Sequence, residues 1–436
     1  MYHYLARISK KLLPDWLYER LIGDWDKQGL KKYLQNTSWL AVAKIVSLVA
    51  SFITIAIVAR YLGPENYGKL SYAQSFVALI SVLASLGIDQ ILYRDLVAHP
   101  EKEAEILGTA FFSKLFLGLF TIIVAYILVL TLNLEPVLSL LILIITCSFI
   151  VQPFGVIANV FAARVKSKYT AYIAIFVALL IPLIKLSVVW LGGGILFFAS
   201  VLVVETAIYS IGSLLIYVTI FKEDIFSWKF SITRLKNMLW RSFPLALASL
   251  SGYIYGRIDQ VMILHYIDSG AVGLYDIAVR LTEYLGYLPG LIIASLFPAI
   301  MNSRSSSASE YTHRWRSLII LCLSITTISA LIITLFAKPI IGLLFGESFI
   351  ASVKILQIYV WSILGSISIV LIQQYLIVEN KMRIFLYFSF AGASINVVLN
   401  SLLIPKYGIY GAAFATIITM ITIIVGFLFF KRIQDK

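Results

Sequence analysis

The stretch SGYIYGRIDQVMIL, residues 251–264, places two charged side chains in a segment that otherwise suits the hydrocarbon core of a membrane. A charge at the centre of a membrane-spanning helix costs roughly 2.5 to 3.5 kcal/mol, so a chain keeps one only where a partner or a cavity stabilises it. Arg257 and Asp259 are two residues apart, which corresponds to about 200° around a helix. They cannot share a face, and each therefore needs its own environment.

The composition of the whole chain indicates a polytopic membrane protein. Of its 436 residues, 60% are hydrophobic and 13% are charged, and the mean hydropathy is +0.93, well outside the range of soluble domains. Apolar runs of about 20 residues, the length that crosses a bilayer, predict about twelve spanning helices. The predicted helices cover residues 37–59, 67–93, 105–131, 136–163, 169–191, 195–221, 238–265, 271–300, 313–336, 351–378, 383–404 and 408–430.

The connections between these helices alternate between basic and non-basic segments. By the positive-inside rule, the basic connections and both chain termini are expected on the cytoplasmic side of the membrane. Lysines and arginines of these connections account for most of the net charge of +13, so the charge does not require a nucleic-acid partner. The basic connections are residues 164–168, 222–241, 302–316 and 379–383.

Two faint internal repeats indicate that the chain has two related halves. YLGPENYGKLSYA at 61–73 aligns without gaps with YIDSGAVGLYDIA at 266–278 and matches Gly68 with Gly273. GILFFA at 194–199 and GIYGAA at 408–413 occur in the same relative helix of each half. Because each half holds an even number of helices, both would insert in the same orientation, as in paired bundles around a central cavity. The alternative is that helix starts merely share glycine, tyrosine and alanine.

The predicted organisation is therefore an all-α membrane protein with two pseudo-symmetric lobes of six helices. The N-terminal residues mix leucines and aromatic residues with lysines, which is typical of an amphipathic helix at a membrane surface. The expected parts are a cytoplasmic amphipathic segment at 1–35, an N-lobe at 36–221, a cytoplasmic linker at 222–237 and a C-lobe at 238–436.

Ten charged side chains lie inside the predicted spans and away from the span ends. If all ten faced lipid, the cost would be on the order of 25 to 35 kcal/mol, more than the net stability of a typical fold. Most of them must therefore face a cavity or one another. They are Lys44, Asp89, Lys114, Lys185, Glu205, Arg257, Asp259, Asp276, Arg280 and Glu283.

Roles for some of these charges follow from their chemistry and spacing. Asp276, Arg280 and Glu283 lie at i, i+4 and i+7, on one helix face that either lines a cavity or neutralises itself. We predict that Arg257 faces the cavity, because a guanidinium binds phosphate through two parallel hydrogen bonds. Asp259 is predicted to pair with a cation of a neighbouring helix, such as Arg280. The alternative is that all these charges form interhelical ion pairs and bind no ligand.

Motifs of enzymes and metal sites are absent from the sequence, which has no P-loop, no HExxH and no histidine cluster. Cys147 and Cys322 both lie in apolar segments and are expected to be packing residues. The non-basic connections are too short to carry a catalytic domain. A transporter without cofactor or metal is therefore expected.

Segments along most of the chain resemble a known family. They are IAIVARYLGPENYGKLSYAQS at 55–75, ASLGIDQILYRDL at 84–96, the run from YGRIDQ to FPAI at 255–300, and IPKYGIYGAAFAT at 404–416. From about residue 33 the chain resembles the Wzx-type O-antigen and polysaccharide flippases of the multidrug/oligosaccharidyl-lipid/polysaccharide exporter superfamily. This resemblance implies two lobes around a central cavity and alternating access. It also implies that undecaprenyl-diphosphate-linked oligosaccharide moves from the inner to the outer leaflet of the bacterial cytoplasmic membrane.

The resemblance and the charges together define the expected site. The resemblance also implies contact with membrane lipids and partnership with a polysaccharide polymerase and a chain-length regulator. A proton or sodium gradient is expected to drive transport, with Glu205 or Glu283 carrying the ion. Expected substrate contacts are Arg257, Arg280, Lys44, Lys114, Lys185, Tyr253 and Tyr284, and expected coupling or ion-pair residues are Asp259, Glu283, Asp276, Glu205 and Asp89.

Two other functions remain open. A multidrug cation exporter of the same superfamily is expected to have a mainly acidic and aromatic pocket, whereas five of the ten intramembrane charges here are cationic. A membrane scaffold that transports nothing would not need charges at several depths. Drug susceptibility and surface-polysaccharide assays would distinguish the three functions.

Overall fold

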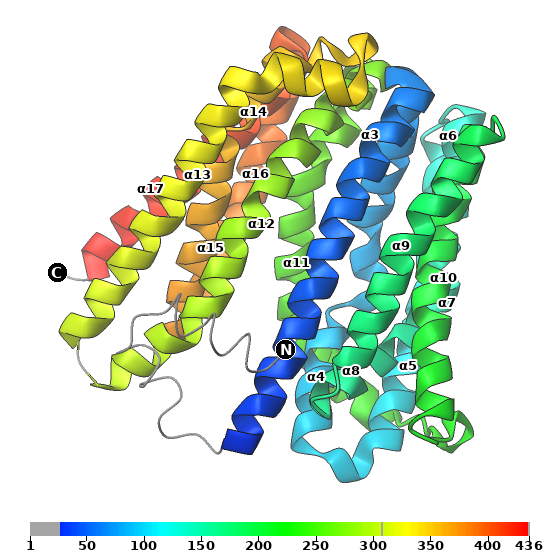
Figure 1. Cartoon of the computed structure of the whole chain (residues 1–436), viewed down its shortest axis with the longest axis vertical. Helices are drawn as coiled ribbons and strands as arrows, with labels where there is room; N and C mark the ends of the chain where they lie inside the picture. Colours follow the sequence, from blue (N-terminus) through cyan, green and yellow to red (C-terminus); the bar gives the residue numbers. More distant parts are fainter. Residues whose placement is uncertain (1–26, 307, 435–436) are drawn as a thin grey trace.

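The computed structural model describes residues 27–306 and 308–434. α-Helices make up most of this part of the chain, and it contains no β-strand. The helices stand side by side, roughly along the longest axis of the molecule (Figure 1). Of the predicted amphipathic segment 1–35, residues 1–26 lie outside the described residues, and the remainder forms the start of the first long helix.

The N-lobe is formed by the helices drawn from blue to green in Figure 1. Its fourth predicted span, 136–163, is divided into α6, α7 and α8 by short turns, one of which contains Pro153. The helices of this lobe are α3 (Lys27–Ser85), α4 (Ile88–Ala98), α5 (Glu103–Thr131), α6 (Pro136–Thr146), α7 (Ser148–Val151), α8 (Val156–Ala163), α9 (Lys168–Trp190) and α10 (Ile195–Thr219).

The C-lobe follows after a connection that contains a 3-10 turn at Ile225–Ser227. Its first helix begins at Ile232, so the last residues of the predicted linker 222–237 are helical. The helices of this lobe are α11 (Ile232–Tyr266), α12 (Ser269–Ser306), α13 (Ala308–Phe345), α14 (Ser352–Tyr359), α15 (Ser362–Val378), α16 (Met382–Tyr407) and α17 (Ile409–Gln434).

The first helix, α3, contains the first two predicted spans, because the chain bends within it at Gly63. Gly63 has φ 71° and ψ 172°, a backbone conformation that favours glycine, and Pro64 follows it. Proline lacks the backbone N–H that would continue the helical hydrogen bonding of the segment before the bend, here called the first leg of α3. The segment after the bend is the second leg. The second leg ends at Ser85 rather than near the predicted residue 93, and α4 continues after Gly87, also at φ 71°.

The number of membrane crossings agrees with the sequence. Within the described residues, ten helical segments are long and apolar enough to span a bilayer, and the first of them, Val42–Ser85, includes the bend at Gly63. The helix α11 is not among the ten, but its 35 residues extend about 50 Å at 1.5 Å per residue. Counting both legs of α3 and adding α11, the prediction of about twelve crossings is confirmed.

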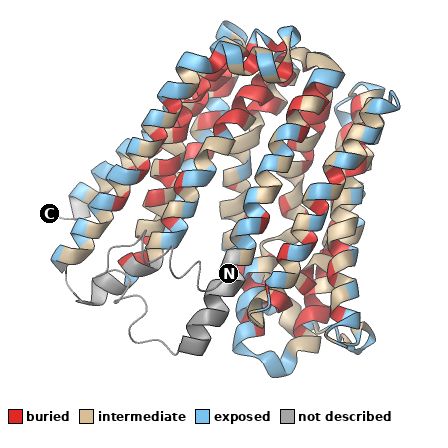
Figure 2. Ribbon diagram, viewed as in Figure 1, coloured by how far each residue is buried: buried red, intermediate tan, exposed pale blue. Residues whose placement is uncertain are grey.

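The outward faces of the helices are apolar. On α5, exposed side chains recur at helical spacing at Phe116, Phe120, Ile123 and Ile127. Figure 2 shows such exposed residues on the outer faces and buried residues where helices face one another. Exposed apolar stripes of this length are expected where lipid is the solvent.

The basic connections gather at one end of the molecule, here called the basic end. The connections α8–α9, α10–α11 and α15–α16 lie at this end, and α5–α6, α9–α10 and α11–α12 lie at the opposite end (Figure 1). The basic and the non-basic connections therefore lie at opposite ends of the molecule, as the sequence predicts. It remains a prediction that the basic end faces the cytoplasm.

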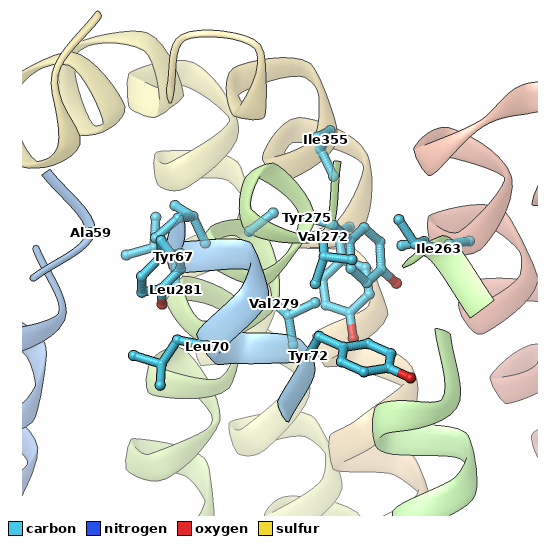
Figure 3. Packing of buried hydrophobic residues seen from close by; sticks show 14 of the residues in the cluster. Ala59, Tyr67, Leu70, Tyr72, Ile263, Val272, Tyr275, Val279, Leu281 and Ile355 are labelled. Atoms are coloured by element: carbon cyan, nitrogen blue, oxygen red, sulfur yellow. The ribbon is translucent and has the colours of Figure 1, made fainter. Parts of the chain in front are cut away.

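The lobes meet where the second leg of α3 packs against α12 and α11. Tyr67, Leu70 and Tyr72 from α3 lie in one buried cluster with Val272 and Tyr275 from α12 (Figure 3). Lipid is as apolar as these side chains, so close packing rather than exclusion from water stabilises the contact. This interface also places polar residues of both lobes within hydrogen-bonding distance.

Candidate functional site

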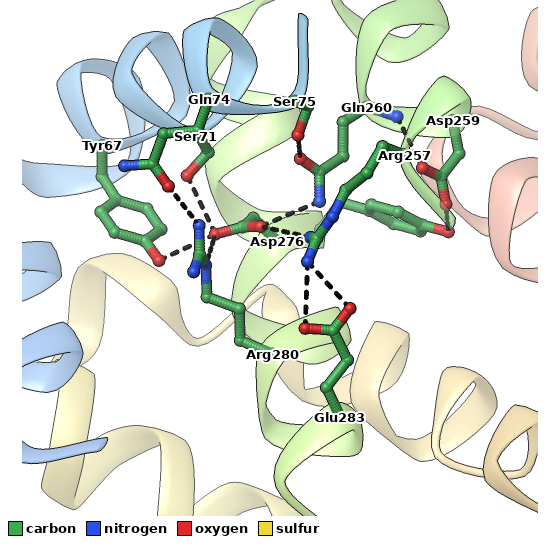
Figure 4. A network of polar contacts seen from close by, with 11 residues as sticks. Tyr67, Ser71, Gln74, Ser75, Arg257, Asp259, Gln260, Asp276, Arg280 and Glu283 are labelled. Atoms are coloured by element: carbon green, nitrogen blue, oxygen red, sulfur yellow. Dashed lines mark hydrogen bonds and ion pairs between the residues drawn. The ribbon is translucent and has the colours of Figure 1, made fainter. Parts of the chain in front are cut away.

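A buried carboxylate, Asp276 on α12, is the centre of a polar network between the lobes (Figure 4). Its Oδ2 accepts hydrogen bonds from the hydroxyl groups of Tyr67 at 2.8 Å and Ser71 at 2.9 Å, both on α3. Its Oδ1 accepts one from Nε2 of Gln260 on α11, at 2.9 Å. A buried charge is stable only with such partners. Since these partners lie on α3 and α11, Asp276 links helices of both lobes.

Two arginines approach this carboxylate from different positions (Figure 4). Arg280 donates from Nε to Asp276 and from Nη2 to Oε1 of Gln74 at 2.8 Å. Nη1 of Arg257 lies 4.0 Å from Oδ1 of Asp276, and Nη2 of Arg257 lies 3.0 Å from Oε1 of Glu283. The three charges predicted on one face of α12 thus have different partners: Asp276 holds Arg280, whereas Glu283 holds Arg257.

A first cavity of about 370 Å³ lies between α3, α9 and α10, with α12 of the C-lobe completing its wall. It combines two cationic groups with hydroxyl and aromatic side chains, which is the chemistry that recognises phosphate and sugar groups. The polar and aromatic residues of its lining are Ser47, Ser51, Thr54, Tyr67, Gln74, Lys185, Phe198, Glu205, Tyr209, Arg280 and Tyr284.

Lys185 is the cation of this cavity without an ion pair. Among the described residues, neither Lys185 nor Glu205 has a hydrogen-bond or ion-pair partner. Arg280, by contrast, uses some of its donors on Asp276 and Gln74. Glu205 in the same cavity attracts Lys185 electrostatically but makes no ion-pair contact with it, so the ammonium keeps its donors for an anionic ligand.

A second cavity of about 450 Å³ lies on the C-lobe side of α12. It contains Arg257 and Glu283 as an ion pair, together with hydroxyl groups of the four helices α11, α12, α14 and α15. Its polar and aromatic lining residues are Tyr255, Arg257, Thr282, Glu283, Tyr287, Tyr359, Ser362 and Ser366.

The predicted partner of Asp259 is wrong. Asp259 is buried, and its Oδ2 accepts a hydrogen bond of 2.6 Å from the hydroxyl group of Tyr275. Its Oδ1 accepts one from the backbone N–H of Gln260 at 2.8 Å. Arg280 lies with Asp276 instead, because the i, i+4 spacing on α12 brings these two together within one helix turn.

The remaining predicted site residues lie outside the linings of both cavities. Nζ of Lys114 is 2.8 Å from Oδ1 of Asp89, so these two residues neutralise each other inside the N-lobe. Nζ of Lys44 lies 4.5 Å from the ring centroid of Tyr287, a cation–π contact from α3 to α12. Tyr253 is exposed on α11.

Several polar residues of the network were missed in the sequence. Tyr67, Ser71 and Gln74 lie at i, i+4 and i+7 and so share one face of α3. Ser75, next on this face, donates a hydrogen bond to Gln260. Polar residues at helical spacing within an apolar span were a signal that could have identified this face.

The described residues contain no group of three or more histidine, cysteine, aspartate or glutamate side chains that could hold a metal ion. The linings of the two cavities offer a ligand hydrogen-bonding, charged and aromatic groups.

Comparisons with known proteins agree with this architecture. Residues 33–304 match the family model described as "Polysaccharide biosynthesis protein". The probable low-salt glycan biosynthesis flippase Agl15 of Haloferax volcanii is 24% identical, and the alignment covers 86% of this chain and 79% of Agl15.

Solved structures show the same fold. The lipid II flippase MurJ, in an inward closed conformation, has a TM-score of 0.72 at 17% identity, with 90% of this chain and 87% of MurJ covered. An inward-facing multidrug resistance transporter of the MATE family in the MOP superfamily has a TM-score of 0.74 at 15% identity, with 92% and 98% covered. The predicted fold and the predicted resemblance to the exporter superfamily are confirmed. The chain belongs to the polysaccharide biosynthesis protein family.

Proposed function

We propose that this protein moves undecaprenyl-diphosphate-linked oligosaccharides from the inner to the outer leaflet of the bacterial cytoplasmic membrane. Membership of the polysaccharide biosynthesis family supports a role in glycan export, as do the flippases among its relatives and structural neighbours. The basic end would face the cytoplasm together with both chain termini, and the lobes would alternate in access. A polymerase and a chain-length regulator would act on the exported repeat unit.

The observation that carries the proposal is the unpaired Lys185 near Arg280 in the first cavity. A diphosphate bears several anionic oxygens, and removing them from water is favourable only where cations replace the lost hydration. Lys185 offers a point charge and Arg280 a planar set of donors, and the hydroxyl groups of the cavity add neutral donors. A cavity of this kind suits the head of a lipid-linked glycan.

The energy source is proposed to be a proton or sodium gradient acting on Glu205. This carboxylate lies in the first cavity without an ion-pair partner among the described residues, so an ion can reach it. Glu283 is the weaker candidate, because Arg257 neutralises it at 3.0 Å.

The test is transport by purified protein in liposomes that contain fluorescent undecaprenyl-diphosphate-linked oligosaccharide. A membrane-impermeant quencher measures how fast the labelled lipid changes leaflet. We expect Lys185→Ala to slow this movement about tenfold or more, because a lost charge-assisted contact is worth about 1.5 to 3 kcal/mol. Lys354→Ala, at an exposed lysine of α14 outside both cavities, should transport at the wild-type rate.

Three outcomes would contradict the proposal. Wild-type protein that leaves the labelled lipid in place but transports a cationic dye would be a multidrug exporter. Wild-type protein that moves neither would support a scaffold. Equal transport rates for wild type and Lys185→Ala would show that the diphosphate does not bind at Lys185 in the first cavity.

A further inference from the structure

The two cavities on either side of α12 differ in how their charges are paired. In the first, Arg280 is held by Asp276, whereas Lys185 and Glu205 line the cavity without an ion-pair contact among the described residues. In the second, Nη2 of Arg257 lies 3.0 Å from Oε1 of Glu283, so the charges cancel. The first cavity therefore leaves an ammonium available to an anionic ligand, whereas the second is polar and its charges are paired.

The second cavity has hydroxyl groups that the protein leaves available. The hydroxyl of Tyr255 has no hydrogen-bond partner among the described residues. Within the described part of the chain, the hydroxyl of Ser366 donates only to the sulfur of Met420 at 3.7 Å, and a thioether is a weak acceptor. The side chain of Glu283 is 45% exposed, which leaves acceptor sites beside its contact with Arg257. These groups can bind a ligand rich in donors and acceptors.

An ion is a poor ligand for this cavity. A cation would compete with the guanidinium of Arg257 for Glu283, and an anion would compete with Glu283 for Arg257. The described residues also provide no cluster of three metal-binding side chains here or elsewhere. A neutral polyhydroxyl compound avoids both conflicts, because it can donate to the carboxylate and accept from the guanidinium at once.

We propose that the second cavity binds the sugars of the lipid-linked repeat unit, while the first binds its diphosphate. This inference rests on the proposed function. Tyr284 lines the first cavity and Tyr287 the second, and their ring centroids are 6.1 Å apart. A single ligand that occupies both cavities would pass over these two aromatic faces, which suit the apolar faces of sugar rings.

The two parts of the substrate are consequently recognised separately. Arg280 and Glu283 lie on successive turns of α12, and Asp276 lies between the arginines of both cavities (Figure 4). The first cavity would bind any glycan lipid with a diphosphate head. The second would distinguish among glycans, which makes it the specificity-determining part of the site.

The experiment measures binding to the full-length protein in nanodiscs with two probes. One is undecaprenyl diphosphate without sugar, and the other is the lipid-linked oligosaccharide extracted from the source organism. The test variant is the double substitution Tyr255→Phe and Ser366→Ala, which removes two hydroxyl groups and little volume. The matched control is Tyr387→Phe with Ser368→Ala, since Tyr387 is exposed and Ser368 donates to the backbone of its own helix.

We expect the test variant to bind the lipid-linked oligosaccharide about tenfold more weakly, as the loss of two neutral hydrogen bonds predicts. Its affinity for undecaprenyl diphosphate should stay within twofold of wild type, and the control should match wild type with both probes. Equal weakening with both probes, or no weakening with either, would overturn the proposal. So would a change confined to the sodium dependence of binding, because the cavity would then hold a cation.

Wild-type protein tells the two proposals apart. If it binds both probes with the same affinity, the sugar site is wrong while the proposed function stands. If it binds neither probe, the proposed function itself fails.

Discussion

Gly68 on α3 and Gly273 on α12 pack backbone against backbone where the two lobes cross. A Cβ atom on Gly68 would lie 2.8 Å from the backbone nitrogen of Gly273, and one on Gly273 would lie 3.1 Å from that of Gly68. These are the two glycines that the internal repeat aligns with each other. Related positions of the two halves therefore meet at the interface, as expected near a pseudo-twofold axis.

This crossing predicts that a single methyl group disrupts the contact between the lobes. In Gly68→Ala the new Cβ would lie 1.7 Å from the backbone oxygen of Ser269, so α12 must move away. We expect a loss of about 3 kcal/mol or more, at the upper end for overpacking, seen as a lower unfolding temperature in detergent. Gly252→Ala is the control, because no atom lies within 4 Å of its new Cβ. An unchanged unfolding temperature for Gly68→Ala would mean that the lobes do not meet in this way.

The buried carboxylate at the centre of the network predicts a second effect on stability. Asp276→Ala removes the acceptor of Tyr67 and Ser71 and leaves the charge of Arg280 without its partner. We expect a loss of about 3 to 5 kcal/mol, the range for breaking a buried ion pair, and a smaller loss for Asp276→Asn. Glu65→Ala is the comparison, because this carboxylate is 72% exposed and pairs with Lys69 at the surface. Similar unfolding temperatures for Asp276→Ala and Glu65→Ala would contradict a stabilising network.

Coupling to an ion gradient is predicted to depend on Glu205. Glu205→Gln keeps the shape of the side chain but can neither carry a proton nor bind sodium as a carboxylate does. We expect this variant to bind glycan lipid and to lose the acceleration of transport that a proton or sodium gradient produces. Glu283→Gln should retain the acceleration, since its carboxylate is already neutralised by Arg257. If the gradient accelerates Glu205→Gln as strongly as wild type, coupling lies elsewhere.

The orientation in the membrane can be tested at the two ends of α9. Lys166 lies at the basic end of the molecule and Gly193 at the opposite end. A reporter fused after Lys166 should read as cytoplasmic, and one fused after Gly193 should read as external. Reversed readings would show that the protein has the opposite orientation in the membrane. If both reporters read the same side, α9 does not cross the membrane.

The sequence by itself determined the class of protein, the membrane spans and the repeat. Apolar runs of membrane length are local features of the sequence. Because every backbone group in lipid must form its hydrogen bond within its own helix, each spanning helix can be recognised without knowing which helices surround it. The same locality explains why a self-neutralised face was one of the two alternatives that the sequence left open for Asp276 and Arg280, since these residues are one turn apart on α12. Bends are harder to place: Gly63 and Pro64 mark one, but the end of the second leg of α3 at Ser85 depends on the packing around it.

Only the tertiary structure decided which partner each remaining charge has. Asp259 was expected to meet a cation and instead accepts a hydrogen bond from Tyr275. The pairing of Arg257 with Glu283 could not be identified from spacing, because the two residues lie on different helices. The sequence contains five intramembrane cations, and nothing local distinguishes Lys114, which Asp89 neutralises, from Lys185, which lines a cavity unpaired. The physical reason is that ion pairs between helices depend on helix rotation and crossing. These are set by close packing, such as that of Gly68 against Gly273, and not by any property of a single helix.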